Sequence, residues 1–413
     1  MQTALADFIK DTPEGQEADA ILRKCVHCGF CTATCPTYQL LGDELDGPRG
    51  RIYLIKQVVE GEAPTARTLT HLDRCLTCRN CETTCPSGVQ YAHLVDIGRS
   101  LVERKVERPL GQRLLRGALR EGLTRRWLFD PAMRVGQAVR PLLPATIRAK
   151  VPERRSPGRW PDTAHPRRVL LLDGCVQPAM MPGIDAATAR VLDRLGVQAL
   201  VARGSGCCGA IRQHLNDAAG ALADVRRNVD AWWPHVDPDG DPALRVEALL
   251  INASGCGAMV KEYAHLLRDD AAYAARAERI VALTRDAAQW LPAELERLKP
   301  MLRRPPARKL AFHPPCTLQH GQQVRGAVES MLTALGATLV PVQDAHLCCG
   351  SAGTYSVLQP DLSGQLRMRK LAALEADRPE MILSANVGCL AHLQAGTDTP
   401  VRHWLEWVDE AIA

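Results

Sequence analysis

Two cysteine runs of identical form lie in the first quarter of the chain. The first reads "CVHCGFCTATCP" and the second reads "CLTCRNCETTCP", so both follow the pattern C-x2-C-x2-C-x3-C-P. Three thiolates at this spacing wrap around one iron–sulfur cube, and the fourth, carried past a turn and a proline, points to a second cube. A zinc site would instead need paired C-x2-C knuckles that close one tetrahedron. The spacing therefore predicts two [4Fe-4S] clusters in a ferredoxin-type domain.

The fourth cysteine of each run predicts crossed ligation. We expect these ligand sets: Cys25, Cys28, Cys31 and Cys85 for cluster I, and Cys75, Cys78, Cys81 and Cys35 for cluster II. "GPRGRIYLIKQVVEGE" and "VQYAHLVDIGRSLVERK" each read as a helix, so the domain is expected to be helical. Arg49 and Arg51 have two open readings, a plain surface or helix-start role and compensation of the charge of a reduced cluster or contact with a partner. His27 and His71 flank the ligands and are interpreted as their surroundings.

The other eight cysteines form two quartets. Three members of the first recur 141 residues later and the fourth recurs 133 residues later; the quartets are Cys175, Cys207, Cys208 and Cys256, and Cys316, Cys348, Cys349 and Cys389. Such an echo indicates an internal duplication. Each cysteine follows a short apolar run, as in "RRVLLLDGC" and "RKLAFHPPC", and helix-like segments come next, which predicts β-α-β units with parallel sheets. The thiols are then expected to gather at the carboxyl ends of strands, where open α/β sheets bind ligands.

Several readings of the quartets stay open. Four thiolates suffice for one further cluster in each copy, the two copies can share one centre, or the cysteines are buried structural remnants of an ancestral site. Gly204, Gly206 and Gly209 also spell G-x-G-x-x-G, the dinucleotide fingerprint. In the second copy only the glycine after the paired cysteines, Gly350, is kept. We therefore attribute this glycine to the cysteine motif and expect no flavin or nicotinamide on this chain.

Charge and hydropathy bear on compartment and partners. No apolar run reaches the roughly 18 residues that span a bilayer, and the first residues lack a secretory signal. We therefore expect a cytoplasmic protein, in which sixteen cysteines favour metal or redox chemistry over disulfides. Residues 103–168 hold 17 Lys/Arg against 6 Asp/Glu. Anionic lipid, an acidic partner subunit or a solvated linker would each explain this basic stretch, whereas nucleic acid would not, because no groove-reading motif accompanies it.

These patterns predict an α+β multidomain chain in four segments. We expect a helical dicluster ferredoxin domain over 1–102 and a basic helical linker or docking segment over 103–165. Two duplicated α/β cysteine-rich repeats with parallel sheets follow over 166–305 and 306–413.

"CVHCGFCTATCPTYQLLGDELDGPRGRIYLIKQ", "DRCLTCRNCETTCPSGV" and the twin "CCG" segments resemble the iron–sulfur subunit of bacterial glycolate oxidase over essentially the whole chain. The resemblance implies flavin-containing partner subunits that carry FAD and oxidise glycolate to glyoxylate, so no catalytic residue is expected here. It also implies an electron acceptor in the membrane such as quinone, and a peripheral position on the inner face of the cytoplasmic membrane.

The repeats also resemble those of heterodisulfide reductase and of the small subunit of anaerobic glycerol-3-phosphate dehydrogenase, in which each repeat ends C-x-x-C. Here Met259 follows Cys256 and His392 follows Cys389 at that place. This departure argues against the non-cubane cluster of the reductase and makes His392 a candidate extra ligand. The alternative functions are a subunit of a glycerol-3-phosphate or lactate dehydrogenase complex, and a heterodisulfide or quinone reductase with its own active centre at the paired cysteines.

Overall fold

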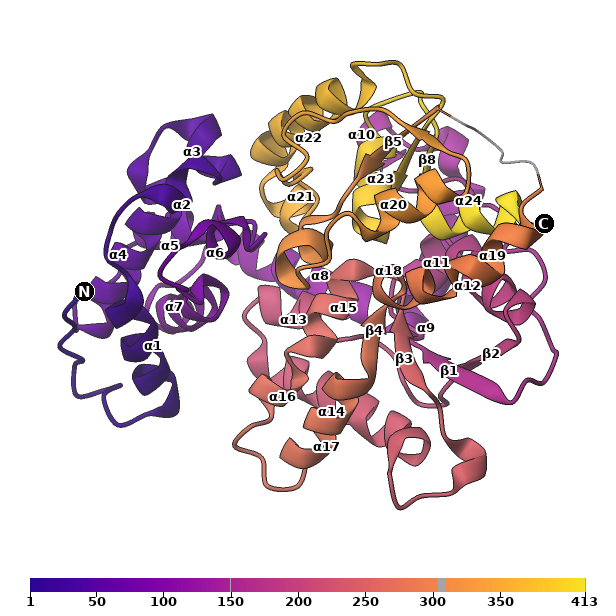
Figure 1. Ribbon diagram of the computed structural model, residues 1–413. Helices are drawn as coiled ribbons and strands as arrows, with labels where there is room; N and C mark the ends of the chain where they lie inside the picture. The colour runs from indigo at the N-terminus through magenta and orange to yellow at the C-terminus, as the bar shows by residue number, and fades with distance from the viewer. Residues whose placement is uncertain (149, 304–308, 413) are drawn as a thin grey trace. The chain divides into compact units, whose positions relative to one another are not determined.

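The computed structural model describes residues 1–148, 150–303 and 309–412 and divides the chain into two compact units (Figure 1). Unit 1 comprises residues 1–118, 214–216 and 346–370, and unit 2 comprises residues 119–213, 217–345 and 371–413. The expected boundary between residues 305 and 306 lies outside the described residues.

Unit 1 is helical. Its elements are α1 (Pro13–Lys24), α2 (Phe30–Ala33), α3 (Pro36–Leu41), η1 (Glu44–Asp46), α4 (Pro48–Val59), α5 (Ala66–Asp73), α6 (Asn80–Thr84), α7 (Tyr91–Lys105), the first part of α8 (Leu110–Thr124), α21 (Tyr355–Leu358) and most of α22 (Pro360–Glu375). Proline begins α1, α3 and α4, where its missing N–H costs nothing and its fixed φ suits the first turn. The two helices that the sequence predicts around the cysteine runs are confirmed as α4 and α7.

The core of unit 1 lies between the longer helices α1, α4, α5 and α7. Leu22, Ile55, Leu72 and Leu94, one from each of these helices, are fully buried in a single cluster that also contains Cys25, Cys75 and Cys81. The helices therefore supply the rigid base on which the cysteine loops rest.

Unit 2 contains two four-stranded parallel sheets. The strands are β1 (Arg167–Leu171), β2 (Val197–Val201), β3 (Ala248–Ile251), β4 (Thr284–Asp286), β5 (Lys309–His313), β6 (Thr338–Leu339), β7 (Met381–Ser384) and β8 (Val401–His403). Their orders are β2-β1-β3-β4 and β6-β5-β7-β8, so the two sheets have the same topology. The predicted fold class is confirmed. The sequence reading missed β4 and β8, which are only three residues long and lie away from any cysteine.

Helices surround both sheets. In unit 2 they are the last turns of α8, α9 (Arg126–Ala138), α10 (Ala145–Arg148), α11 (Gln177–Met180), α12 (Gly183–Arg194), most of α13 (Ala210–His214), α14 (Ala218–Val236), α15 (Ser254–Lys261), α16 (Tyr263–Leu266), α17 (Ala274–Leu283), α18 (Ala287–Trp290), α19 (Leu295–Leu298), α20 (Ala327–Ala334), the end of α22, α23 (Val387–Gln394) and α24 (Trp404–Ala411). Shorter turns are η2 (Arg140–Leu142), η3 (Pro242–Leu244), η4 (Leu291–Glu294), η5 (Lys299–Met301) and the π-helical η6 (Thr317–Gly321).

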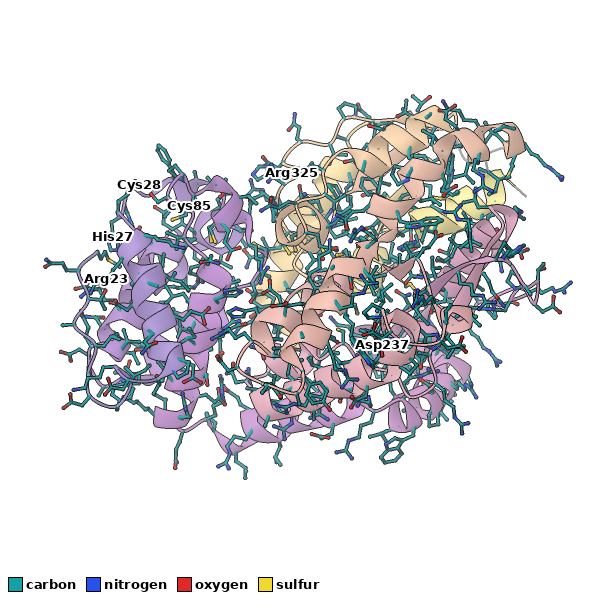
Figure 2. The ribbon with its side chains drawn as sticks, turned by 60° about the horizontal axis from the view of Figure 1, so that its bottom comes forward. Arg23, His27, Cys28, Cys85, Asp237 and Arg325 are labelled. Carbon is teal, nitrogen blue, oxygen red and sulfur yellow. The ribbon has the colours of Figure 1, made fainter. Side chains whose placement is uncertain are left out.

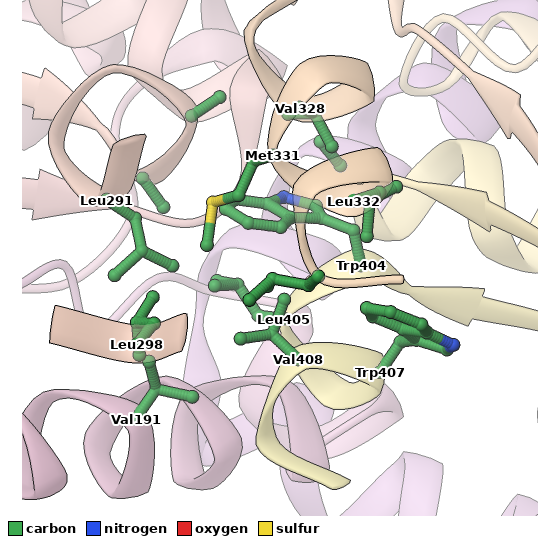
Figure 3. Packing of buried hydrophobic residues seen from close by; sticks show 14 of the residues in the cluster. Val191, Leu291, Leu298, Val328, Met331, Leu332, Trp404, Leu405, Trp407 and Val408 are labelled. Carbon is green, nitrogen blue, oxygen red and sulfur yellow. The ribbon is translucent and has the colours of Figure 1, made fainter. Parts of the chain in front are cut away.

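One hydrophobic core joins the two repeats of unit 2. Trp404 and Trp407 of α24 are buried in the same cluster as Val191 of the first repeat and Met331 of the second (Figure 3). Because residues of both sheets bury apolar surface in this one cluster, the repeats stabilise each other. Within the described part of the chain, no helix has the length and apolar character needed to cross a bilayer.

Candidate metal centres

The two N-terminal cysteine runs fold into loops of the same backbone shape. The residue before the second cysteine and the residue after it are left-handed in both: His27 and Gly29 have φ of 57° and 87°, and Thr77 and Arg79 have φ of 52° and 59°. A non-glycine residue in this region costs about 1–3 kcal/mol and is typical of sites that hold a ligand. Both runs therefore have the same loop shape around their second cysteine.

The first group of thiols contains a member of the second run. Cys25, Cys28, Cys31 and Cys85 line one cavity together with His27. Figure 2 labels His27, Cys28 and Cys85 in the same part of unit 1. Burial, together with Cys25 and Cys85, raises the pKa of Cys31 to about 11. The pKa of Cys25 is also raised, by burial and then by Cys85. The structure therefore brings the last cysteine of the second run to the first three of the first run.

The second group shows the reciprocal arrangement. Burial raises the pKa of Cys81 well above its ordinary value, and the nearby Cys78, Cys75 and Cys35 raise it further. Cys35 is the last cysteine of the first run, and it is buried, with 7% of its surface exposed. Eight cysteines thus form two groups of four that exchange one member between the runs.

Hydrogen-bond donors surround the second group. The backbone N–H of Thr77 donates to the Cys75 sulfur at 3.4 Å, and the Tyr91 hydroxyl donates to it at 3.6 Å. Burial and then Cys75 raise the pKa of Tyr91, so this hydroxyl keeps its proton. The Thr37 hydroxyl lies 3.3 Å from the Cys35 sulfur. Donors placed on sulfur stabilise the thiolate form that binds metal.

Arg51 is a buried residue of the second group's surroundings. It is 1% exposed, and its guanidinium donates to the carbonyl of His71 at 2.7 Å and to the Asp46 carboxylate at 3.5 Å. Burial alone would lower its pKa, but Tyr91, Cys75 and Cys35 hold it above its usual value. The sequence contained a signal for this burial, since Arg51 lies four residues before Ile55 on the apolar side of α4.

Arg49 and His71 have different surroundings. Arg49 is ion-paired with Glu44 at 2.6 Å, and its guanidinium also donates to the His27 carbonyl at 3.5 Å. The His71 ring lies 3.0 Å from Asp46. Both histidines that flank the runs therefore make contacts beside the thiol groups.

The first quartet of the duplicated part gathers in unit 2. Cys175, Cys207, Cys208 and Cys256 follow β1, β2 and β3, and their thiols lie close enough for each to shift the pKa of the next in that order. The neighbouring Cys207 thiol, followed by burial, raises the pKa of Cys175 well above its ordinary value. Four thiols thus meet at the carboxyl ends of three strands, as expected for this copy.

A buried polar pair holds the Cys207–Cys208 turn. Asn228 is fully buried; it accepts from the Gly206 N–H at 2.9 Å and donates to the Cys207 carbonyl at 2.8 Å. The Tyr263 hydroxyl donates to the Cys208 carbonyl at 2.9 Å and accepts from Asn228 at 3.0 Å. These bonds satisfy the backbone of the turn and fix the direction of its two side chains.

The glycine after each cysteine pair has the same role in both copies. Gly209 and Gly350 have φ of 93° and 91°. Their N–H groups donate to the sulfurs of Cys207 and Cys348, each at 3.4 Å. The left-handed backbone at this position in both copies favours glycine, which explains why a glycine follows the cysteine pair in each.

The second quartet is divided between the units. Cys316 precedes η6 and Cys389 lies in α23, both in unit 2, whereas Cys348 and Cys349 belong to unit 1. His392 is buried one turn after Cys389. In the first copy Met259 is packed in a core cluster with Cys208, so an apolar side chain occupies the corresponding place.

The paired-cysteine segment of the second copy packs on the second cysteine run within unit 1. The Tyr355 hydroxyl donates to the Arg74 carbonyl at 3.1 Å, and Asn80 donates to the His346 carbonyl at 3.2 Å. Burial raises the pKa of Tyr355, and the nearby Cys75 and Cys348 raise it further. The segment therefore contacts the loop of the second thiol group, which the sequence did not predict.

Family comparisons agree with both halves of the chain. A 4Fe-4S dicluster domain matches residues 21–89, and a cysteine-rich domain matches twice, at residues 169–261 and 310–394.

Full-length relatives are also found. The chain is 54% identical to the glycolate oxidase iron-sulfur subunit of Escherichia coli, over 100% of this chain and 99% of that one. It is 30% identical to the probable glycolate oxidase iron-sulfur subunit of Bacillus subtilis, over 91% and 89%. The lactate utilization protein A of an Exiguobacterium strain is 26% identical over 59% of this chain. The chain therefore belongs to the family of glycolate oxidase iron–sulfur subunits.

Proposed function

We propose that this chain is the electron-transfer subunit of a complex that oxidises glycolate to glyoxylate. The observation that carries the proposal is the exchange of Cys35 and Cys85 between two groups of four thiols, which is the arrangement that two neighbouring clusters require. The full-length identity to a glycolate oxidase subunit supports the substrate.

The residues of both thiol groups fit [4Fe-4S] clusters. Each group offers four sulfurs and a largely apolar surrounding, and in the second group the Thr77 N–H donates to the Cys75 sulfur. We assign Cys25, Cys28, Cys31 and Cys85 to cluster I, and Cys75, Cys78, Cys81 and Cys35 to cluster II. When bound, each cluster accepts and donates one electron at a time. The chain holds them, excludes water from Cys25 and Cys81, and places the charge of Arg51 beside the second group.

The first quartet of the duplicated part fits a further cluster. Its four thiols lie close enough to shift one another's pKa in sequence, and the Gly209 N–H donates to the Cys207 sulfur. We therefore propose a third cluster on Cys175, Cys207, Cys208 and Cys256. A fourth on Cys316, Cys348, Cys349 and Cys389, with His392 as a candidate ligand, is the corresponding proposal for the second copy. We retain the division at residues 102, 165 and 305 as a proposal for the sequence modules.

Partners complete the reaction. We propose that flavin-containing subunits carry FAD and perform the hydroxy-acid chemistry, and that electrons leave towards a membrane acceptor such as quinone. The chain is then cytoplasmic and lies peripherally on the inner face of the membrane. The next candidate substrate is lactate, because relatives named lactate utilization protein A match 54–59% of this chain at 25–29% identity.

The test is anaerobic purification of the complex with analysis of iron, acid-labile sulfide and substrate use. Two cubes predict about 8 iron atoms per chain, and one or two further clusters predict about 12 or 16. The complex should reduce a quinone analogue with glycolate in preference to lactate or glycerol 3-phosphate. A complex that contains zinc in place of iron, or that is inactive with glycolate and active with lactate, would refute the proposal. Reduction of a disulfide by the isolated chain would favour the reductase alternative.

A further inference from the structure

Helix α9 has apolar residues on two opposite sides. Phe129 and Met133, four residues apart, are buried, and α9 packs on α11, where Gln137 donates to the Ala179 carbonyl at 3.4 Å. Since residues four apart share one side of a helix, these three residues attach α9 to unit 2. This side accounts for the helix's place in the fold.

The outward side of α9 carries a second apolar row. Trp127, Pro131, Val135 and Val139 are again four residues apart, and Trp127 and Val135 are 72% and 64% exposed. Leu142, which follows in η2, is 85% exposed. We call these five residues the α9 face. Adjacent apolar side chains that are exposed to water are unfavourable, and such a patch is typical of an interaction site. The row therefore indicates an interaction surface.

Basic residues accompany the α9 face. Residues 125–160 contain nine Lys/Arg and two Asp/Glu, and both acidic residues are neutralised within the unit, Asp130 by Arg126 at 3.2 Å and Glu153 by Arg140 at 2.9 Å. Arg134 and Arg148 are exposed and form no ion pair with any described residue. The side chains that remain available next to the apolar row are therefore cationic.

We propose that the α9 face docks on an anionic lipid bilayer. An in-plane helix with Trp, Val and Leu on its outer side and arginines beside them is the combination that inserts among acyl chains and headgroups. Charge complementarity favours lipid, because residues 125–160 carry an excess of 7 positive charges whereas the whole chain carries +5, so the remainder is net acidic and is repelled by the same surface. The inference rests on the proposed delivery of electrons to a membrane acceptor and adds the surface that makes contact.

Vesicle flotation of the intact, cluster-loaded complex tests the proposal. The lipids are phosphatidylethanolamine with phosphatidylglycerol, compared with phosphatidylcholine alone. The double variant Trp127→Ser/Leu142→Ser should bind the anionic vesicles at least about tenfold more weakly, as should Arg134→Gln/Arg148→Gln. Leu244→Ser, which changes an apolar residue 42% exposed elsewhere in unit 2, should bind like the unchanged protein.

Three results would overturn the inference. The first is unchanged binding of both double variants to anionic vesicles. The second is loss of the flavin subunits from the Trp127→Ser/Leu142→Ser variant, which would assign the face to a partner protein. Iron content and glycolate oxidation with a soluble dye are measured on the same samples. If these are intact while vesicle binding is absent from the unchanged complex, the α9 inference fails and the proposed electron-transfer function stands.

Discussion

Arg51 and Asp46 form an ion pair that is almost completely removed from solvent, 1% and 0% exposed, with 3.5 Å between Nη2 and Oδ1. Asp46 is shared: Arg74 reaches its other oxygen at 2.7 Å. Two guanidinium groups, those of Arg51 and Arg74, thus share the single Asp46 carboxylate. Together the three groups leave a net positive charge next to the thiol group that contains Cys35 and Cys75. A buried positive charge favours the more negative, reduced state of a cluster held there.

We predict that Arg51→Met lowers the midpoint potential of cluster II by on the order of 100–200 mV, the size expected for one charge about 4–7 Å away at an effective dielectric of about 20. Redox titration followed by EPR measures the shift. Arg51→Lys keeps the charge and should recover most of the potential, although it loses the bond to the Thr37 hydroxyl at 3.2 Å. A shift of cluster I instead of cluster II would contradict the assignment.

Crossed ligation makes a prediction that uncrossed ligation does not. Cys85→Ser should alter the EPR signal of the cluster held by the first run, and Cys35→Ser that of the cluster held by the second run. The signals are assigned with Cys28→Ser and Cys78→Ser, one from each run. If Cys85→Ser and Cys78→Ser were to change the same signal, each run would hold its own cluster.

The cysteine loops and the duplicated sheets could be predicted from the spacing of cysteines along the sequence. The cysteine runs fix their own loop shape, and the 141-residue echo reflects two sheets of the same strand order. Contacts between distant segments were not predictable. Nothing around Tyr355 indicates that its hydroxyl bonds to the Arg74 carbonyl, 281 residues away. Asn228 likewise has no local motif, because its role depends on the turn that it stabilises.

The third proposed cluster predicts a selective loss of iron. Cys207→Ser/Cys208→Ser removes two of the four neighbouring thiols of the first repeat, so the protein should lose about 4 iron atoms per chain and keep the EPR signals of clusters I and II. The matched variant in the second repeat is Cys348→Ser/Cys349→Ser. Unchanged iron in the first variant would show that the quartet is structural.

The glycine after each cysteine pair gives a test of the turn. A Cβ added at Gly350 would lie 2.7 Å from the Ser363 carbonyl oxygen, in a backbone with φ of 91°. We expect Gly350→Ala to destabilise the protein by about 2 kcal/mol or more, since the left-handed conformation alone costs about 1–2 kcal/mol. Gly364→Ala, in α22 with open space around it, should instead stabilise by about 0.5–1 kcal/mol. Thermal unfolding compares the two; equal melting temperatures would contradict the role of the turn.

His403 makes the stability of unit 2 depend on pH. Its ring is fully buried at the start of α24, its Nδ1 accepts from the Leu405 N–H at 3.2 Å, and burial lowers its pKa to about 3. An unfolded histidine has a pKa of about 6.5. The unfolded state therefore binds the extra proton first. The contribution of neutral His403 to the free energy of unfolding is therefore fully present above about pH 6.5. It falls, by up to about 1.4 kcal/mol per pH unit, as the pH drops towards 3.

The measurement compares the unchanged protein with His403→Asn, because two other groups act in the opposite direction. Burial raises the pKa of Asp185 and Asp286 to about 6, so their contributions grow as the pH falls below 6. Asparagine at the N-cap still accepts a backbone N–H and does not titrate. We measure the free energy of unfolding of both proteins by urea titration with tryptophan fluorescence. From pH 7 to pH 5 the free energy of unfolding of the unchanged protein should fall by about 2 kcal/mol relative to that of His403→Asn. His235→Asn, at the end of α14, is the control, and a His403→Asn difference that stays constant with pH would show that the ring is not held neutral by burial.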